Sequence, residues 1–209
     1  YTPGMKVQHL REGREMKIAN ALTFMANERV HMDSAYAGDI IGIYNHGQLH
    51  IGDTLTEGEK LGFTGIPYFA PELFRSARAR DPLKGKQLHQ GLKELGEEGA
   101  IQVFEGEFGN LMLGAVGQLQ FEIVAQRLAT EYKVDAIYEP TDVSTARWLV
   151  FPDDVTKKNF MNEQSNRLAH DCEGNICYMA TSIYNLQTTM KHWPDVKFLT
   201  TREQGQKFE

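Results

Sequence analysis

The sequence has few cysteines and no long hydrophobic run. Two cysteines among 209 residues are too few for the disulfide framework that holds many small secreted domains together. A helix that crosses a bilayer needs roughly 20 consecutive apolar residues, and no stretch of the chain approaches this length. No signal-peptide pattern is visible either. We therefore expect a cytoplasmic protein without membrane contact.

The chain also lacks an excess of positive charge. Its 22 lysines and arginines are outnumbered by 28 acidic residues, which gives a net charge of −6. Domains that bind nucleic acid through their overall charge are basic, so any RNA contact has to use a local patch. The apolar and charged fractions are those of an ordinary globular protein.

Nucleotide-binding motifs are absent as well. The sequence contains no GxxxxGK[ST] segment to hold phosphates and no Asn-Lys-x-Asp segment of the kind that reads guanine. The glycines from Gly106 to Gly117 do not form a dinucleotide site, because a strand pattern rather than a helix follows Gly109. We predict no catalytic and no cofactor-binding residue in this chain.

The potential metal ligands are few and scattered. Cys172 and Cys177 flank a hairpin turn near His170, but a zinc site needs about four ligands and no second cluster is in sight. His46 and His50 surround another turn without a carboxylate pattern. We interpret the cysteines as unpaired structural thiols and predict no metal site.

Two acidic pairs could suggest acid–base chemistry. Glu97-Glu98 lies at a predicted helix end, and Glu105 and Glu107 lie at a predicted hairpin. Solvated acids are common at both kinds of position, so we favour a surface role for them.

Residues 1 to 66 contain short strand patterns separated by Gly and Asn turns, which is typical of a small antiparallel barrel. The predicted strands are Met5–Leu10, Met16–Phe24, Asp39–Tyr44 and Leu49–Ile51. A Gly-Asp pair occurs twice, at Gly38-Asp39 and at Gly52-Asp53. Gly gives backbone freedom at a corner and Asp bonds its own local backbone, so the pairs predict two equivalent starts of barrel strands. Two unrelated turns are the alternative.

Residues 67 to 140 predict a βαββαβ unit, which is the ferredoxin-like order. Two prolines within Ile66–Pro71 indicate a linker, and Asp81-Pro82 indicates a helix start. Leu88, Leu92 and Leu95 form one buried helical face, which Gly96 and Gly99 end. The second helix carries the stripe Phe121, Val124, Leu128 and Tyr132. The predicted strands are Glu72–Ala79, Ile101–Glu105, Leu111–Val116 and Val134–Tyr138.

Residues 141 to 209 repeat this order of elements. A helix is predicted over Asp153–Gln164, and a second one, capped by Ser182, carries Ile183, Leu186 and Met190. The predicted strands are Arg147–Phe151, Leu168–Cys172, Ile176–Thr181 and Val196–Thr200. We infer two related α/β halves, although no residue-by-residue repeat is visible.

Several segments resemble one protein family. "AGDIIGI" followed by "IGDTL" is similar to the second, β-barrel domain of translational GTPases. "FAPELFRSARARDPLKGKQLHQGLKELGEEGAIQVF" and "LGAVGQLQFEIVAQRL" closely resemble the bacterial release factor 3 family, and so do "TARWLVF", "ATSIYNL" and "PDVKFLTTRE". The resemblance covers essentially the whole chain, whereas elongation factor G is a looser match.

The resemblance implies an α+β chain with a truncated translation-factor domain II barrel at 1–66, a ferredoxin-like unit at 67–140 and a second such unit at 141–209. Because the chain opens on Tyr1, we interpret it as a C-terminal fragment whose N-terminal part is missing, and we expect it to be a monomer. The G domain that binds GTP or GDP with Mg²⁺ would then be missing. The implied partner is the ribosome, through its RNA and proteins. The stop-codon-reading release factors that this family removes at termination are an indirect partner.

Two other functions stay open. The chain could belong to another ribosomal translocase-type GTPase, such as elongation factor G or a ribosomal protection protein, and a long further domain after residue 209 would favour this. It could also be a stand-alone enzyme on a ferredoxin-like scaffold, since a fold does not fix a function. A deep pocket with converging polar groups would favour the enzyme.

A run of basic residues is the strongest functional signal from the residues themselves. Six lysines and arginines lie between positions 75 and 93, and Asp81 is the only acidic residue in this interval. Positive charge near the start of a helix is unfavourable, because it opposes the helix dipole. Stability therefore does not explain these cations, and contact with phosphates is the favoured explanation. A solvated helix face is the alternative. The candidate ribosome or RNA contacts are Arg75, Arg78, Arg80, Lys84, Lys86 and Lys93, with a smaller group at Arg11, Arg14 and Lys17.

Overall fold

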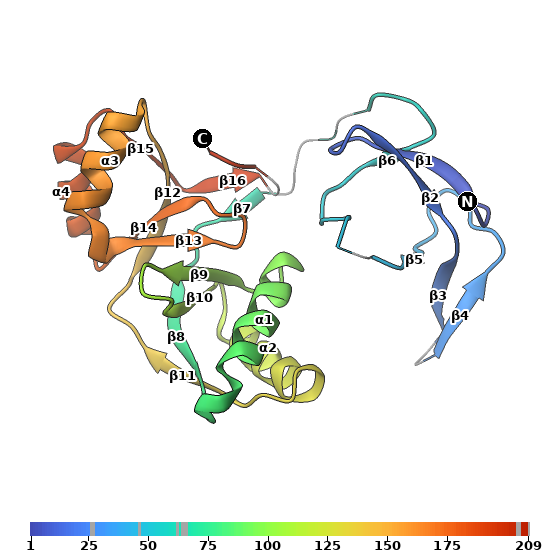
Figure 1. Ribbon diagram of the computed structural model, residues 1–209, viewed down its shortest axis with the longest axis horizontal. Coiled ribbons are helices and arrows are strands. Elements are labelled where there is room, and N and C mark those ends of the chain that lie inside the picture. The colour runs from blue at the N-terminus through green and yellow to red at the C-terminus, as the bar shows by residue number, and fades with distance from the viewer. Residues whose placement is uncertain (26–27, 46, 62, 64–66, 204–205, 209) are drawn as a thin grey trace. The chain divides into compact units, whose positions relative to one another are not determined.

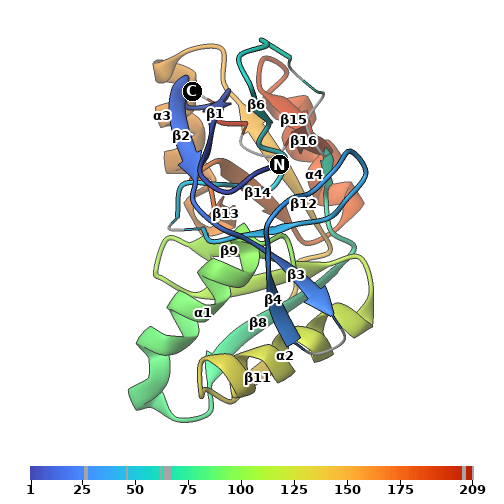
Figure 2. The same ribbon diagram turned by 90° about the vertical axis from the view of Figure 1, so that its right-hand side faces the viewer.

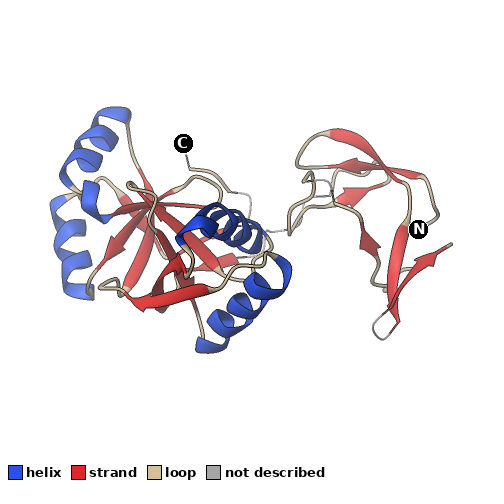
Figure 3. Cartoon of the chain, turned by 60° about the horizontal axis from the view of Figure 1, so that its bottom comes forward, coloured by secondary structure: helices blue, strands red, loops and turns tan. Residues whose placement is uncertain are grey.

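In the computed structural model the chain forms two compact units, residues 1–65 and residues 66–209 (Figure 1). The structure describes residues 1–25, 28–45, 47–61, 63, 67–203 and 206–208. The first unit is built from strands and turns, and the second combines strands with helices (Figure 3). The predicted α+β class is therefore confirmed.

Two three-stranded antiparallel sheets build the first unit, with the orders β2-β1-β6 and β4-β3-β5. Their strands are β1 Met5–His9, β2 Arg14–Ile18, β3 Ala21–Met25, β4 Glu28–Met32, β5 Gly42–Ile43 and β6 Leu55–Thr56. Val7, Ile18 and Leu22 are buried, as alternation along a strand requires. The predicted strand Met16–Phe24 is in fact split between β2 and β3. The predicted strand Leu49–Ile51 is wrong, because these residues lead into a turn and β6 starts later.

The two Gly-Asp pairs form the same turn. Gly38 has φ +100° and Gly52 has φ +86°, values that favour glycine. The Asp39 carboxylate accepts a hydrogen bond from the Tyr36 backbone N–H at 2.7 Å, and Asp53 accepts one from the His50 N–H at the same distance. Each turn comes two or three residues before a strand, β5 or β6. The prediction of two equivalent starts of strands is confirmed.

One eight-stranded antiparallel sheet runs through the second unit in the order β11-β8-β10-β9-β13-β14-β12-β15. In the first half, β8 lies between β11 and β10, and β9 forms the edge that meets the second half. The second half has the same arrangement, with β12 between β15 and β14 and with β13 at the shared edge. This is the ferredoxin-like order in both halves. Pairing of β9 with β13 joins the halves, with His170 opposite Glu105. The strands are β8 Leu73–Ala79, β9 Gln102–Gly106, β10 Leu111–Ala115, β11 Ala136–Pro140, β12 Thr145–Val150, β13 Leu168–Asp171, β14 Ile176–Ala180 and β15 Lys197–Leu199.

Each half of the sheet carries its own helices on one face. Helices α1 Gly85–Glu97 and α2 Gln118–Glu131 lie side by side on the first half (Figure 2). Helices α3 Asp154–Glu163 and α4 Ile183–His192 lie on the second half (Figure 1). Short 3₁₀ turns, Pro82–Lys84 and Ser165–Arg167, precede α1 and β13. The Ser182 side chain caps α4, because its Oγ accepts from the Asn185 N–H at 3.0 Å.

Three apolar clusters hold this unit together. The predicted stripe Leu88, Leu92 and Leu95 of α1 is buried against the sheet, and each fully buried leucine contributes about 1.5–3 kcal/mol. A second cluster surrounds Phe160 under α3 and α4. The third cluster contains Phe104 and Trp148 and lies on the face of the sheet that carries no helices. Its residues come from both halves, so the halves also pack on each other through this face.

The predicted linker Ile66–Pro71 is wrong for its central residues. Pro67–Phe69 forms strand β7, which pairs antiparallel with β16, Thr201–Glu203, and Tyr68 lies opposite Arg202. Proline is tolerated there because this two-stranded sheet consists of edges only. The predicted helix end at Gly96 and Gly99 is confirmed, because α1 stops at Glu97 and Gly99 follows the cap residue with φ +74°, its N–H donating to the Gly96 carbonyl at 3.0 Å. None of the helices within the described residues is long and apolar enough to cross a membrane.

Candidate nucleic-acid interface

Two arginines of the basic run on β8 are engaged by the protein itself. Arg75 donates from Nη1 to the Phe74 carbonyl at 2.8 Å, and its guanidinium lies 5.8 Å from the centre of the Phe121 ring. Arg78 forms an ion pair with Glu139 of the neighbouring strand β11, with Nη2 and Oε1 2.8 Å apart. These contacts give both arginines a part in packing the sheet, which the sequence pattern does not distinguish from ligand contact.

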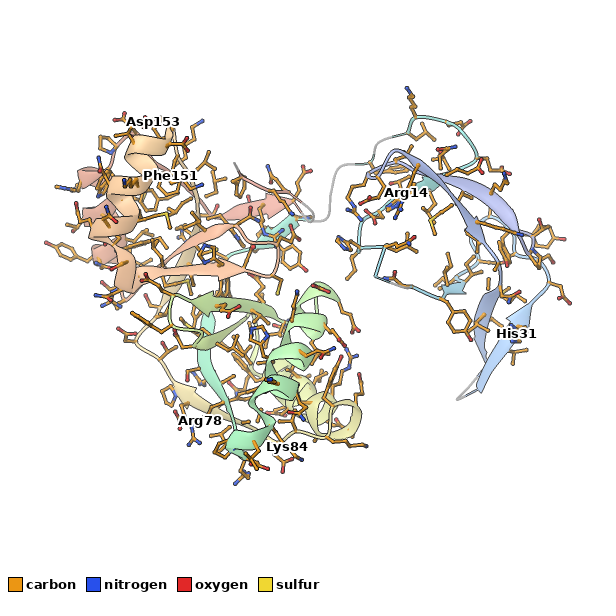
Figure 4. The ribbon with its side chains drawn as sticks, viewed as in Figure 1. Arg14, His31, Arg78, Lys84, Phe151 and Asp153 are labelled. Carbon is orange, nitrogen blue, oxygen red and sulfur yellow. The ribbon has the colours of Figure 1, made fainter. Side chains whose placement is uncertain are left out.

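The run continues through the 3₁₀ turn that leads into α1. The Asp81 carboxylate accepts from the Leu83 N–H at 3.0 Å and caps this turn. Lys84 Nζ donates to the Lys133 carbonyl at 2.6 Å, so it ties the turn to the residues after α2. Figure 4 shows Arg78 and Lys84 at the same end of the unit. Arg78, Arg80 and Lys84 therefore lie near the point where β8 passes into α1, whereas Arg75 and Lys93 lie farther along these two elements.

Three cations of the run are exposed and carry unbalanced charge. Arg80, Lys86 and Lys93 make no side-chain ion pair or hydrogen bond with any residue that the structure describes. Lys86 and Lys93 are seven residues apart, about two turns, and therefore lie on one side of α1. Lys93 also borders a small pocket beside His89 and Glu105, whose Nε2 and Oε2 atoms are 3.2 Å apart. We call Arg80, Lys86 and Lys93 the basic surface.

In the first unit, Arg11 belongs to a polar cluster around Asp53. Its Nε donates to Asp53 Oδ1 at 2.6 Å and its Nη2 to the Gln48 carbonyl at 3.1 Å. His9 Nε2 lies 2.8 Å from Asp53 Oδ2, and both side chains are at most 6% exposed. This places the guanidinium of Arg11 in a structural role.

The surroundings of Asp53 change its pKa. Burial raises it, but hydrogen bonds from Arg11, the His50 backbone and His9 outweigh this effect, and the pKa falls to about 2. The second Gly-Asp turn is thus held by an ionised aspartate, whereas Asp39 in the first turn is exposed.

The other two candidates of the first unit remain accessible. Arg14 and Lys17 project from β2 and line an open pocket of about 560 Å³ together with Asn45 and Gln48. Arg14 is labelled in Figure 4. Cations beside amide side chains suit a phosphate or sugar surface, so both residues stay candidates.

A buried ion cluster is the polar site that the sequence analysis missed. Arg202, in β16, has a side chain only 5% exposed; its Nε lies 2.9 Å from Asp171 Oδ2 and its Nη1 3.0 Å from Glu173 Oε2. The guanidinium also lies 4.7 Å from the centre of the Tyr68 ring and 5.6 Å from that of Trp148. These residues come from four separate segments of the chain, so no local sequence pattern predicts the cluster. It clamps β7 and β16 onto the β13–β14 turn.

The two thiols are free and poorly reactive. Cys177 is buried, and burial raises its pKa well above the usual value. Burial, with the charges of Asp171 and Glu97, raises the pKa of Cys172 to about 12. Since the thiolate is the nucleophile and metal ligand, these environments fit structural thiols.

Two of the four predicted acidic residues contact basic side chains at the surface. Glu98 accepts from Arg127 at 2.6 Å, and Glu105 contacts His89. Within the described residues, no three His, Cys, Asp or Glu side chains gather so that they could hold a metal ion. His46 lies outside these residues.

Two family descriptions match adjacent parts of the chain. "Elongation factor G domain 2" matches residues 1–58, and "Class II release factor RF3, C-terminal domain" matches residues 63–190. The chain belongs to the release factor 3 family. The peptide chain release factor 3 of Aromatoleum aromaticum is 70% identical over 207 residues, which is 99% of this chain and 38% of that protein. The predicted family is confirmed, and the match to elongation factor G domain 2 is confined to the first unit.

The fold has a solved counterpart as well. A crystal structure of a protein from Thermus thermophilus matches with a TM-score of 0.57 and 22% identity, covering 73% of this chain and 23% of the other. At this identity the likeness shows the fold alone. The chain thus spans well under half the length of the release factor 3 relative and of this structure.

Proposed function

We propose that this chain is the ribosome-contacting, non-catalytic part of a release factor 3-type GTPase. Such a protein would promote the removal of stop-codon-reading release factors at the end of translation. Membership of the family and the 70% identity to a protein named peptide chain release factor 3 support this. In this proposal GTP and Mg²⁺ are bound by residues outside the chain, which works in the cytoplasm as part of a monomer.

The basic surface is the observation that supports RNA contact. Arg80, Lys86 and Lys93 are exposed cations that pair with no described residue, in a chain whose net charge is −6. Lys86 lies in the first turn of α1, where the helix dipole disfavours positive charge. A nearby phosphate would reverse this cost, because it brings negative charge to the same end of the helix. We infer that the surface docks onto the backbone of ribosomal RNA.

The test replaces Arg80, Lys86 and Lys93 by alanine in a full-length protein that carries this chain. Ribosome affinity should fall, because each lost phosphate contact removes one released counterion. The slope of log affinity against log salt should become less steep by about 2–3. Sedimentation of ribosome complexes at several salt concentrations gives both quantities.

A matched control is the triple change of Lys157, Lys158 and Lys191 to alanine. It removes the same charge from α3 and α4 of the other half and should leave the salt slope unchanged. Thermal unfolding and GDP affinity should stay the same in both triple variants. If the basic-surface variant binds ribosomes with the affinity and salt slope of the parent protein, RNA docking through this surface is wrong.

A further inference from the structure

A pocket of about 480 Å³ lies at the seam between the two halves of the second unit, and no residue of the basic surface lines it. It is lined by three connections: the β9–β10 turn, the segment after β11, and the 3₁₀ turn before β13. In Figure 1 the β9–β10 turn lies just below the end of α3. We call it the seam pocket. Its volume falls within the range of ligand sites, about 300–1,000 Å³.

The floor of the seam pocket is apolar and adaptable. Met112, Met179 and Leu168 line it and are each less than 10% exposed. Methionine side chains have several rotatable bonds and a polarisable sulfur, so they adjust to flat rings and make favourable contacts with them. The floor is therefore suited to an inserted ring rather than to a fixed aliphatic shape.

The rim supplies an aromatic surface. Phe108, at the tip of the β9–β10 turn, is 85% exposed. Its ring packs against no other aromatic residue among those described, although burying a phenylalanine stabilises a fold by about 1.5–3 kcal/mol. Exposed aromatic side chains beside a pocket are the usual stacking platforms for unpaired nucleobases.

The polar groups of the rim match the edge of a base better than a phosphate. The side-chain amides of Asn110 and Asn166 have no hydrogen-bond partner within the described residues. Arg167 pairs with Asp142, Nη1 to Oδ2 at 2.9 Å, and Glu107 leaves the lining with a net negative charge. A phosphate inside the pocket would be repelled, so a bound nucleotide has to keep its phosphate outside. The amino group of adenine, cytosine or guanine could donate to the carboxylate and amide oxygens of the rim.

We propose that the seam pocket binds one unstacked nucleobase of RNA, with Phe108 as the stacking surface and Asn110 and Asn166 as hydrogen-bonding groups. The inference rests on the proposed ribosomal function for its RNA source. It differs from backbone docking in recognising the base. Bases that carry an amino group should bind better than uracil.

The pocket can be tested directly in the 209-residue chain by titration with nucleoside monophosphates. ¹³C-methyl NMR signals of Met112 and Met179 should shift in a saturable way with AMP, less with UMP, and not with ribose 5-phosphate. Phe108→Ala should weaken AMP binding roughly 5- to 100-fold, as expected for the loss of one stacked base. Leu119→Ala removes another exposed apolar side chain, on α2, and should change nothing. Unshifted methyl signals, or equal shifts with ribose 5-phosphate, would overturn the proposal.

A second experiment distinguishes RNA from protein as the occupant. Phe108 is replaced by the photocrosslinker p-benzoylphenylalanine in the full-length protein, which is then irradiated on ribosomes. Crosslinks to RNA support the proposal, and crosslinks confined to ribosomal protein contradict it. If the protein does not bind ribosomes, the proposed function fails, and the AMP titration still decides whether the pocket accepts a base.

Discussion

Removing the guanidinium of Arg202 should destabilise the second unit more than any surface change. In Arg202→Ala, the carboxylates of Asp171 and Glu173 lose a cation that sits within 3.0 Å of each. The aromatic rings of Tyr68 and Trp148 lose the group that lies against them. The strand pair β7–β16 would then be held mainly by its backbone hydrogen bonds.

The size of the effect follows from the geometry. Breaking a buried ion pair by removing one partner costs about 3–5 kcal/mol, because the other charge stays buried. Asp171 keeps hydrogen bonds from the Trp148 indole at 3.0 Å and from the Asn175 backbone at 2.9 Å, which favours the lower end of the range. At roughly 2–4 °C per kcal/mol for a unit of this size, the melting temperature should fall by about 6–12 °C.

The assay is thermal unfolding followed by tryptophan fluorescence, which reports on the second unit because Trp148 and Trp193 both lie there. Arg80→Ala is the matched control, since it removes an exposed arginine that has no ion pair with a described residue. Its free energy of unfolding should stay within about 0.5 kcal/mol of the parent value. Adding Asp171→Asn to Arg202→Ala should recover part of the loss, because the buried charge is then neutral. If the melting temperature of Arg202→Ala falls by less than about 2 °C, the loss of stability is below about 1 kcal/mol. This result would refute the view that the cluster clamps the strand pair.

Two further predictions concern other parts of the fold. The pKa of Asp53 is about 2 against an ordinary value of 3.8. The ionised form therefore contributes about 2 kcal/mol to the free energy of unfolding above roughly pH 4. This contribution is lost as the pH falls from about 4 to about 2. Asp53→Asn should abolish that acid-sensitive step in circular dichroism of the first unit, and an unchanged acid profile would argue against it. A Cβ on Gly96 would lie 2.5 Å from Cys172 Sγ, so Gly96→Ala should cost about 1–3 kcal/mol in urea unfolding. Adding Cys172→Ala should recover most of that loss, and simple addition of the two costs would contradict a direct contact.

The elements with a local cause could be predicted from the sequence. The spacing of Leu88, Leu92 and Leu95 fixes the buried face of α1, and the hydroxyl of Ser182 needs only the next turn of backbone to cap α4. The two Gly-Asp turns are equally local, because each Asp bonds a residue three positions earlier. Such features depend on a few consecutive residues, which a pattern can reveal.

The features that were missed depend on residues far apart in the chain. Strand β7 exists because β16, near the other end of the second unit, pairs with it. In α4, the predicted apolar position Met190 is 41% exposed, and Thr189 is buried instead because its Oγ1 bonds the Tyr178 hydroxyl at 2.9 Å. For the candidate interface, the sequence located the cations, but only the structure separates Arg75 and Arg78, which the protein engages, from Arg80 and Lys86.

The pairing of β7 with β16 also has a consequence for biosynthesis. The strand that opens the second unit leaves the translating ribosome long before its partner, so its outer edge stays uncovered while the whole eight-stranded sheet is being made. Until β16 is made, Asp171 and Glu173 lack the ion pairs that Arg202 forms with them in the finished fold. A chain that stops before β16 would leave the edge of β7 unpaired and Asp171 without the guanidinium that lies against it in the finished fold, and quality-control proteases should remove such a chain faster than the finished protein.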